Sequence, residues 1–443
     1  MPARHLKSPN STPIANGTAQ QTGDVAAVVQ QVIDDVRISG DAAVRKYSER
    51  FDKWSPPSFK LSEDEIKAII ATVPDQTIKD IKQVQSNVRA FAEAQKASLK
   101  DFEVEIRPGV LLGQKNVPIQ NLTPDSYIPG GRYPLLASAH MTILTAKVAG
   151  VPNVIACTPP IAGEIPGATI AAMYYAGADA IYLLGGTQAI AAMALGTRTI
   201  PKVDFICGPG NAFVATAKAK LYGSIGIDLF AGPTEVLIVA DEHASPFTVA
   251  VDLLSQAEHG PDTPAVLITT SEKVAKEAMA HIDKLLTETE MSTATLASMS
   301  WRDYGEVIVV DTLDEAYALA DSFASEHVQI LTQKPREALE KMRNFGTLFL
   351  GERTCVSYGD KVIGTNHVLP TKGAARYTGG LCVQKFLKTY TYQEIVSAEA
   401  SGELGKLCGR AARAERFEGH ARSGDRRAQL YLKESYKWIY SQE

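Results

Sequence analysis

The sequence has few of the features that mark several large classes of protein. It has only five cysteines, an odd number, and no CxxC pair, so neither a disulfide framework nor a thiolate metal cluster is indicated. No apolar run approaches the roughly 20 residues that a membrane-spanning helix needs. The net charge is only -5, which gives no general attraction to nucleic acid or to an anionic membrane. We therefore expect a cytoplasmic protein in a reducing environment, with neither nucleic acid nor membrane as a partner.

The remaining composition is that of a soluble globular protein, with 45% hydrophobic and 21% charged residues. A chain of 443 residues is long enough for two or three domains with substantial cores. Residues 1–21 contain neither an acidic residue nor an apolar core segment, so they are not a secretory signal. We expect them to be a flexible or arm-like segment, and a weak organellar transit peptide is the alternative.

The spacing of apolar residues along the sequence changes near residue 125. Upstream, residues 24–98 carry apolar side chains at helical spacing, and Ser62 with Glu65 predicts a capping box. Downstream, short runs such as NVIACTPP, AIYLLGG, EVLIVAD and AVLITTS alternate with helical patterns. This alternation predicts parallel sheets wrapped by helices, with enough units for two doubly wound halves. After about Lys385 the strand signal fades, which indicates a smaller helical domain or an arm that packs on a partner.

The stretch LLSQAEHGPD ends a predicted helix with two polar side chains on one face. Ser245 is placed to cap the start of this helix, and Gly260 follows its end. Gln256 and His259 are three residues apart, so their side chains lie together. Imidazole nitrogen and amide oxygen are both acceptable zinc ligands, although Gln is uncommon. A histidine that is favoured by the dipole at a helix C-terminus is the alternative.

Two further stretches carry groups suited to chemistry near neutral pH. In SEHVQI, Glu326 and His327 lie at a predicted helix-to-strand junction, where a carboxylate and an imidazole can share acid–base work. A surface glutamate beside a capping histidine is the alternative. In YGDKVIGTNHVLPT, Asp360 and His367 are seven residues apart, and Asp360 is a good ligand for a divalent cation. A simple Gly-Asp turn would explain that stretch equally.

Three glycine-rich stretches, YIPGG, LLGGTQ and CGPGNAFV, each follow an apolar run, and the last two precede a helix. In that position backbone N–H groups and a helix N-terminus can receive phosphate. None of the three is a GxGxxG motif, and tight strand-to-helix turns would also explain them. The stretch ERFEGH places a lone His420 in the polar C-terminal region, where it matters only if the fold brings it to other ligands.

Taken together, these stretches resemble the histidinol dehydrogenase family. The resemblance runs from about Asp24 to the C-terminus, in the ordered motifs YIPGG, GPGNAFV, AGPTEVLIVAD, DLLSQAEHGPD, SEHVQI and GDKVIGTNHVLPT. It implies one Zn2+ per site, NAD, and oxidation of a primary alcohol to a carboxylate through an enclosed aldehyde. It also implies an intertwined homodimer, in which the C-terminal region of one subunit completes the site of the other.

Carried over by motif, the resemblance implies roles for particular residues. The implied zinc ligands are Gln256, His259, Asp360 and, from the second subunit, His420. The implied acid–base pair is Glu326, which would activate water, and His327, which would take the alcohol proton. The implied NAD contacts are Tyr127, Gln188 and Asn211. The implied substrate contacts are Thr234, His327, His367 and Glu415.

We therefore expect an α/β fold with two doubly wound, Rossmann-like parallel-sheet domains and a small helical C-terminal domain, in an intertwined homodimer. The expected parts are a flexible segment over 1–21, a first α/β domain over 22–126 with 232–380, a second, NAD-side α/β domain over 127–231, and a helical dimerisation domain over 381–443.

The chain departs from the family pattern on the substrate side. Thr234 stands where the family usually has Ser, and Arg416 and Phe417 stand where it usually has Gly-Leu. The segments ARYTGGL and KFLKTYTYQ are more similar to a side branch that includes sulfopropanediol dehydrogenases. An added arginine suits an anionic head group such as a sulfonate or carboxylate, and a solvent-facing Arg416 is the alternative. We therefore favour a small polar alcohol other than L-histidinol, such as a dihydroxypropane sulfonate.

Three other functions stay open. The first is L-histidinol dehydrogenase of histidine biosynthesis. The second is a zinc-dependent hydrolase, because zinc beside a glutamate and a histidine can activate water, although the three glycine-rich turns speak against it. The third is a non-catalytic scaffold, which the intact pair Glu326 and His327 and the four presumed ligands oppose.

Overall fold

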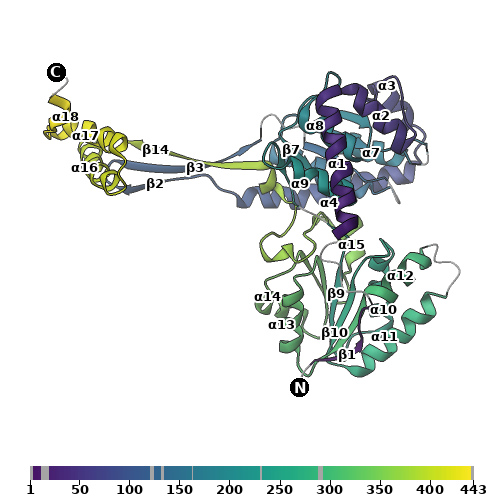
Figure 1. Cartoon of the computed structure of the whole chain (residues 1–443). Helices are drawn as coiled ribbons and strands as arrows, with labels where there is room; N and C mark the ends of the chain where they lie inside the picture. The colour runs from purple at the N-terminus through teal and green to yellow at the C-terminus, as the bar shows by residue number, and fades with distance from the viewer. Residues whose placement is uncertain are drawn as a thin grey trace. The chain divides into compact units, whose positions relative to one another are not determined.

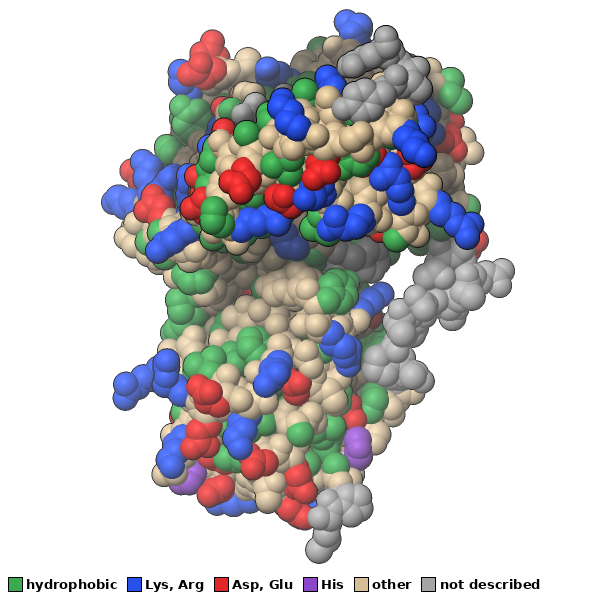
Figure 2. Space-filling model, turned by 90° about the vertical axis from the view of Figure 1, so that its left-hand side faces the viewer, with side chains coloured by type: hydrophobic (Ala, Val, Ile, Leu, Met, Phe, Trp, Pro, Cys, Tyr) green, Lys and Arg blue, Asp and Glu red, His purple; other side chains and the backbone are tan. Residues whose placement is uncertain are grey.

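A computed structural model describes residues 3–10, 19–119, 124–130, 134–161, 163–229, 232–287 and 293–440. The chain divides into two compact units, which are described separately (Figure 1). The first unit comprises Met1–Lys96 and Ile119–Phe386, and the second comprises Ala97–Pro118 and Leu387–Glu443. On the face shown in Figure 2, basic and acidic side chains are interspersed, which agrees with the small net charge. Among the described helices, none combines the length and the apolar character needed to cross a membrane.

The first unit contains a six-stranded sheet in the order β1-β11-β10-β9-β12-β13. Its strands are β1 (Arg4–Lys7), β9 (Val236–Ala240), β10 (Ala265–Thr269), β11 (Gly305–Val309), β12 (His327–Leu331) and β13 (Thr347–Leu350). All neighbours are parallel except β1, which runs antiparallel to β11 at the edge. Strands β9, β10 and β12 are buried along their whole length, as expected for strands that helices cover on both faces.

Helices cover both faces of this sheet (Figure 1). One face carries α10 (Pro246–Ala257), α11 (Glu272–Leu285) and α12 (Ala294–Tyr304), and the other carries α13 (Leu313–Phe323) and α14 (Ala338–Lys341). In β9, Val236 and Ile238 belong to the first buried cluster, whereas Leu237 and Val239 belong to the second. This is the two-residue alternation of a strand between two apolar layers.

A five-stranded, fully parallel sheet occupies the middle of the chain, in the order β6-β5-β4-β7-β8. Its strands are β4 (Pro124–Tyr127), β5 (Ile155–Thr158), β6 (Ala180–Leu183), β7 (Phe205–Cys207) and β8 (Gly226–Ile227). The intervening helices are α5 (Ala137–Ala139), the π-helix η1 (His140–Leu144), α6 (Thr145–Ala149), α7 (Gly167–Ala176), α8 (Gly186–Leu195) and α9 (Ala212–Leu221).

The N-terminal helices pack against this five-stranded half. They are α1 (Ala19–Ser39), α2 (Asp41–Asp52), α3 (Glu63–Ile70) and α4 (Asp75–Ser98). α1 and α2 contact α8, α1 also contacts α9, and α3 contacts α7. The apolar side chains of α1 join the same buried cluster as the Ala-rich helix α8. The first unit is completed by α15 (Val356–Lys361) and three short 3-10 turns, η2 (Pro335–Glu337), η3 (Ala374–Arg376) and η4 (Val383–Phe386).

The second unit is a three-stranded antiparallel sheet followed by helices (Figure 1). Its strands, in the order β14-β3-β2, are β2 (Phe102–Arg107), β3 (Val110–Pro118) and β14 (Leu387–Ile395). Its helices are α16 (Ala398–Ala414), α17 (Glu418–Leu432) and α18 (Lys437–Tyr440). α16 and α17 approach closely at glycines, because a Cβ at Gly405 would lie 2.4 Å from the carbonyl oxygen of Gly424.

The predicted alternation of parallel strands and helices is confirmed for β4 to β7 and for β9 to β13. The predicted capping box of Ser62 and Glu65 is present at the start of α3. The α/β class of the chain, with two parallel sheets, therefore agrees with the sequence pattern.

The structure differs from the sequence-based division of the chain in three places. Residues 4–7, expected to be flexible, form an edge strand because they pair with β11, and residues 11–18 lie outside the described residues. The sequence predicts one domain formed by residues 22–126 and 232–380, but α1 to α3 pack on the helices of the five-stranded sheet and not on the six-stranded sheet. The C-terminal region is not wholly helical, because residues 387–395 pair with β3 along their full length.

Candidate active site

A cleft in the first unit is lined by segments from both parallel sheets. Some follow β4 and β7, at the carboxyl edge of the five-stranded sheet, and others precede β9 or begin β12, at the amino edge of the six-stranded sheet. Its empty volume is about 620 Å³, part of which is open to solvent. The lining includes Thr234, Gln256, His259, Glu326, His327 and Asp360. The cleft therefore gathers residues that are more than 100 positions apart in the sequence.

The C-terminal end of α10 brings Gln256 and His259 into the cleft. Ser245 caps the helix by accepting the N–H of Thr248, as the sequence predicts, and Pro246 occupies the first turn. The helix ends at Ala257, and the N–H of His259 donates to the carbonyl of Gln256 at 3.1 Å. Burial lowers the pKa of His259, so its imidazole is held in the neutral form that a metal ion needs.

Asp360, on α15, faces His259 across the cleft. Its Oδ2 lies 3.8 Å from His259 Nε2, and its Oδ1 lies 3.4 Å from His327 Nε2. Burial by itself raises the pKa of Asp360, but the hydrogen bond and the positive charge of His327 outweigh it and hold that pKa well below its usual range. Asp360 is therefore ionised at neutral pH.

These three side chains fit a zinc ion by their chemistry. The amide nitrogen of Gln256 donates to the hydroxyl of Thr234 at 2.6 Å, which leaves the amide oxygen as the end that a metal can use. A neutral imidazole, an ionised carboxylate and an amide oxygen together give a mixed nitrogen and oxygen donor set of the kind that zinc accepts.

Glu326 and His327 are both buried at the start of β12. His327 Nδ1 lies 3.0 Å from the backbone carbonyl of Glu235, so Nδ1 carries the proton and Nε2 is the nitrogen turned toward Asp360. Burial by itself lowers the pKa of His327, but the nearby carboxylates of Glu326 and Asp360 outweigh this effect, so the net pKa lies above the usual value. The His327 imidazole therefore lies between the carboxylates of Glu326 and Asp360, which favour its protonated form.

Thr234 links the presumed metal ligands to the acid–base pair. Its hydroxyl accepts the Gln256 amide N–H and donates to Glu326 Oε2 at 2.5 Å. The backbone N–H of Glu235 donates to the same carboxylate oxygen at 3.0 Å. Two donors therefore fix Glu326 in place. Thr234 thus has a structural role, and its contact with substrate stays a prediction.

Sequence reasoning missed Glu235 and Ser138, which lie beside this group. Burial raises the pKa of Glu235 to about 7, although its carboxylate accepts the backbone N–H of Lys372. Ser138 lines the cleft, and its hydroxyl lies 3.3 Å from His367 Nε2, while His367 Nδ1 lies 3.0 Å from the carbonyl of Asp360. Glu235 stands in the motif AGPTEVLIVAD, but that motif does not by itself indicate the contacts of its carboxyl group, so only the fold identifies these two residues.

The glycine-rich stretches follow β4, β6 and β7 at the carboxyl edge of the five-stranded sheet, and Gly131 of YIPGG lies outside the described residues. Gly208 adopts a φ of +115°, and a Cβ there would lie 2.3 Å from the carbonyl oxygen of Tyr127, so this position requires glycine. A buried ion pair between Lys218 and Asp228 holds the turn at Gly208 in place. The Lys218 ammonium donates to the carbonyl of Gly208, and the Asp228 carboxylate accepts the backbone N–H of Gly208. This edge is where open α/β sheets bind ligands.

The side chains that the resemblance assigns to NAD make contacts within the protein. Gln188 is fully buried, and its amide nitrogen donates to Asp52 at 2.8 Å. Burial raises the pKa of Asp52 to about 6, although this hydrogen bond lowers it. Asn211 caps α9 by accepting two backbone N–H groups, and Tyr127 is buried at the end of β4. Their role toward NAD stays a prediction.

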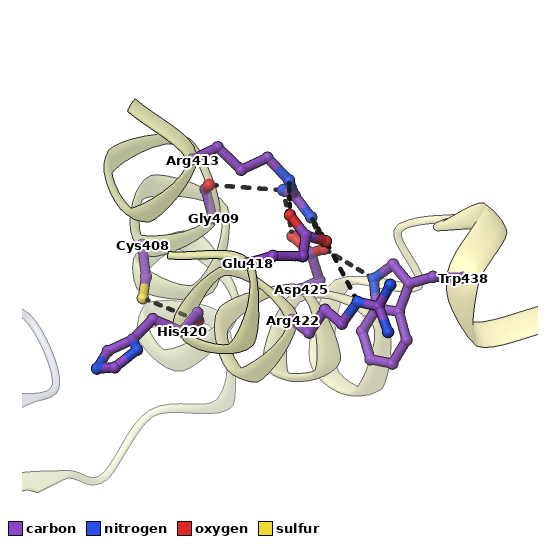
Figure 3. Close-up of polar contacts among 8 residues, drawn as sticks. All are labelled: Cys408, Gly409, Arg413, Glu418, His420, Arg422, Asp425 and Trp438. Atoms are coloured by element: carbon purple, nitrogen blue, oxygen red, sulfur yellow. Dashed lines mark hydrogen bonds and ion pairs between the residues drawn. The ribbon is translucent and has the colours of Figure 1, made fainter. Parts of the chain in front are cut away.

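His420 lies on α17 and Glu415 caps the C-terminal end of α16, both in the second unit. Both side chains are exposed, and the His420 imidazole points away from the polar cluster beside it (Figure 3). In that cluster Arg413 binds the buried carboxylate of Asp425 at 2.5 Å, and Trp438 donates to the same carboxylate at 2.9 Å. These contacts fix the turn between α16 and α17 and leave His420 available to another surface.

Another group of metal-binding side chains, Asp241, Glu242 and His243, lies in the turn after β9. Glu242 and His243 are exposed, whereas Asp241 accepts the backbone N–H groups of His243 and Gln333. Asp241 therefore has a structural role in closing this turn, and exposed acidic groups of this kind are common on protein surfaces.

Comparison with known proteins identifies the family. The family model for histidinol dehydrogenase matches residues 16–428. The chain belongs to the histidinol dehydrogenase family. The family is one of oxidoreductases, so the protein is an enzyme.

Similar proteins within this family cover nearly the whole chain. A histidinol dehydrogenase homolog of Shouchella clausii is 55% identical over 93% of this chain and 96% of its own length. A sulfopropanediol 3-dehydrogenase of Ruegeria pomeroyi is 43% identical over 92% of this chain and 93% of its own. The crystal structure of histidinol dehydrogenase from Elizabethkingia anophelis superposes with a TM-score of 0.86 at 34% identity, covering 95% of this chain and 98% of that one. The side branch inferred from the sequence therefore has relatives among known proteins.

Proposed function

We propose that the protein oxidises a small polar primary alcohol to the carboxylate, through an enclosed aldehyde, in a zinc- and NAD-dependent reaction. The observation that carries this proposal is the cleft in which Gln256, His259 and Asp360 meet the buried pair Glu326 and His327. Membership of the histidinol dehydrogenase family supports the reaction class.

In this proposal Gln256, His259 and Asp360 hold the zinc ion, and His420 of a second copy of the chain is the fourth ligand. Lys218 and Asp228 keep the carboxyl-edge turn in shape for NAD. When bound, zinc would fix the substrate and polarise its reacting oxygen, and two NAD molecules in turn would each accept one hydride.

In its neutral form His327 takes the alcohol proton at Nε2, because Nδ1 is committed to the carbonyl of Glu235. The aldehyde that forms stays in the cleft, which limits side reactions. Glu326 then takes a proton from the water that adds to the aldehyde, and loss of a second hydride gives the carboxylate. Thr234 and the N–H of Glu235 hold the Glu326 carboxylate in position for that step.

For the substrate we propose an alcohol other than L-histidinol, such as a dihydroxypropane sulfonate. The relative named sulfopropanediol 3-dehydrogenase supports this choice. The presence of Thr234 in place of the family's usual Ser also supports it, because Thr adds a methyl group beside the hydroxyl that contacts Gln256 and Glu326. L-histidinol is the competing substrate within the same reaction class. A zinc hydrolase would use the same three ligands, but it would have no use for the glycine-rich turns at the carboxyl edge of the five-stranded sheet.

The test is the rate of NADH formation by zinc-loaded protein with L-histidinol and with a panel of small alcohols that includes anionic diols. We expect turnover of an anionic diol and little turnover of L-histidinol. Robust turnover of L-histidinol alone would make the substrate proposal wrong, and absence of NADH formation with every alcohol would make the reaction class wrong.

A further inference from the structure

Lys361 supplies the only lysine or arginine side chain among the described residues that line the cleft. It is the last residue of α15 and directly follows Asp360. Within the described part of the chain, no hydrogen bond or ion pair engages its ammonium group. A cation without a partner at the wall of a candidate active site is therefore open to a ligand.

The two carboxylates of the cleft do not neutralise this cation, because each has other partners. Glu326 accepts the hydroxyl of Thr234 and the N–H of Glu235, and Asp360 faces the two imidazoles of His259 and His327.

A lysine in the last turn of a helix is also favoured by the helix dipole. That preference explains why a basic residue suits the end of α15, but it is satisfied equally by a side chain that points into solvent. Lys361 is exposed to solvent, but it also lines the cleft, and the helix dipole does not account for that second property.

We propose that the Lys361 ammonium binds an anionic group, a sulfonate or a carboxylate, at the far end of the alcohol substrate. This inference rests on the proposed function and names the substrate class within it. The same charge disfavours a cationic substrate, and L-histidinol carries a protonated amine. Lys361 is thus a residue that determines specificity and takes no part in the transfer of hydride or proton.

The experiment uses full-length, zinc-loaded enzyme and four diols that differ only in the group at one end. They are 2,3-dihydroxypropane-1-sulfonate, 3,4-dihydroxybutanoate, neutral 1,2-propanediol and cationic 3-amino-1,2-propanediol. The variants are Lys361→Met, which removes the charge, and Lys361→Arg, which keeps it. Lys273→Met is the matched control, because Lys273 is an exposed lysine of the same unit outside the cleft.

We expect Lys361→Met to lower kcat/KM for the preferred anionic diol by roughly 10- to 100-fold, mainly through KM, as for loss of a charged hydrogen bond. The neutral diol should change little, the cationic diol should improve, and Lys361→Arg and Lys273→Met should stay within a few-fold of the parent enzyme. Preference between the sulfonate and the carboxylate identifies the head group. Equal losses for the neutral and anionic diols, or no loss at all, would overturn the role of Lys361 while leaving the reaction intact. A parent enzyme that oxidises none of the alcohols would instead overturn the proposed function, and this inference with it.

Discussion

The two units of the chain differ in what they bury. The first unit surrounds each of its parallel sheets with apolar clusters. Among the described residues of the second unit, the buried apolar side chains are only Val110, Ala421, Ala428 and Ile439. Its strand β2 exposes Phe102, Val104 and Ile106 on one side, and further large apolar side chains of this unit are exposed at Tyr390, Ile395, Val396, Leu407, Phe417, Leu430 and Tyr431.

This difference shows that the two units reach stability in different ways. The first unit has enough core to hold its side chains in fixed positions, which is what the candidate active site needs. The second unit buries too little apolar surface to be stabilised by a core of its own. Exposed apolar surface of this extent marks an interaction site, which supports the proposal that a second copy of the chain covers the second unit. Each of the following predictions tests one side of this comparison.

The largest effect is expected for His327→Ala, in the first unit. Loss of the proposed base should lower kcat by about 10²- to 10⁴-fold without unfolding the protein. Steady-state NADH formation and circular dichroism measure the two properties. His243→Ala, at an exposed histidine of the same unit, is the control and should be neutral. Full activity of His327→Ala would remove His327 from the mechanism.

A smaller effect is expected for Thr234→Val, which keeps the shape of the side chain but removes the hydroxyl that joins Gln256 to Glu326. We predict a loss of kcat/KM of roughly 10- to 100-fold, because two buried polar groups lose their shared partner. Thr234→Ser keeps the hydroxyl and should stay within a few-fold of the parent. If the valine variant matched the serine variant, the hydroxyl link would have no function.

In the second unit, Gly405→Ala should destabilise the packing of α16 on α17. The new Cβ would lie 2.4 Å from the backbone of Gly424, and we expect a cost of about 1–3 kcal/mol in the free energy of unfolding. Gly419→Ala is the matched control, since a Cβ there meets no atom within 4 Å. Urea unfolding followed by circular dichroism compares the two. Equal behaviour of the two variants would contradict close backbone packing in this unit.

The smallest effect concerns Asp52, whose pKa is raised from 3.8 to about 6, chiefly by burial, against the lowering hydrogen bond from Gln188. Since its ionised form is disfavoured in the folded state, the folded protein loses stability as the pH rises through this range. Asp52→Asn removes that loss and should stabilise the protein by about 1 kcal/mol above pH 6, after allowance for solvent screening. Thermal unfolding should show the gain shrinking toward pH 4, and a gain that is independent of pH would contradict the raised pKa.

The parallel strands and the helix caps could be predicted from the sequence because their signals are local. β9 and β10 are unbroken apolar runs, and the cap at Ser245 precedes a proline and an amphipathic pattern. β14 was missed from the sequence alone, although its alternating Thr and Tyr residues are typical of a strand; its pairing with β3, far away in the sequence, could not be predicted from a local pattern. The N-terminal strand β1 is likewise defined only by its pairing with β11.

The residues of the candidate site likewise fall into those that a local sequence pattern predicts and those that only the fold identifies. The spacing of Gln256 and His259 is a local signal; helix α10 places Gln256 in the cleft, and the turn directly after the helix places His259 there. The links through Thr234 and Glu235 depend on contacts between β9 and β12, which no local pattern encodes. The role of His420 came only from the resemblance to the family, since a lone exposed histidine carries no signal by itself.

The central claim is that the first unit of one copy holds the chemistry and the second unit of another copy completes its site. The most direct test is to co-express His327→Ala and His420→Ala subunits, each inactive alone, and to measure NADH formation by the mixture. Random pairing makes half of the dimers mixed, and each mixed dimer has one site with both defects and one with neither, so we predict recovery of about one quarter of the parent activity. If the mixture stays inactive, His420 does not act across a subunit boundary and the claim is wrong.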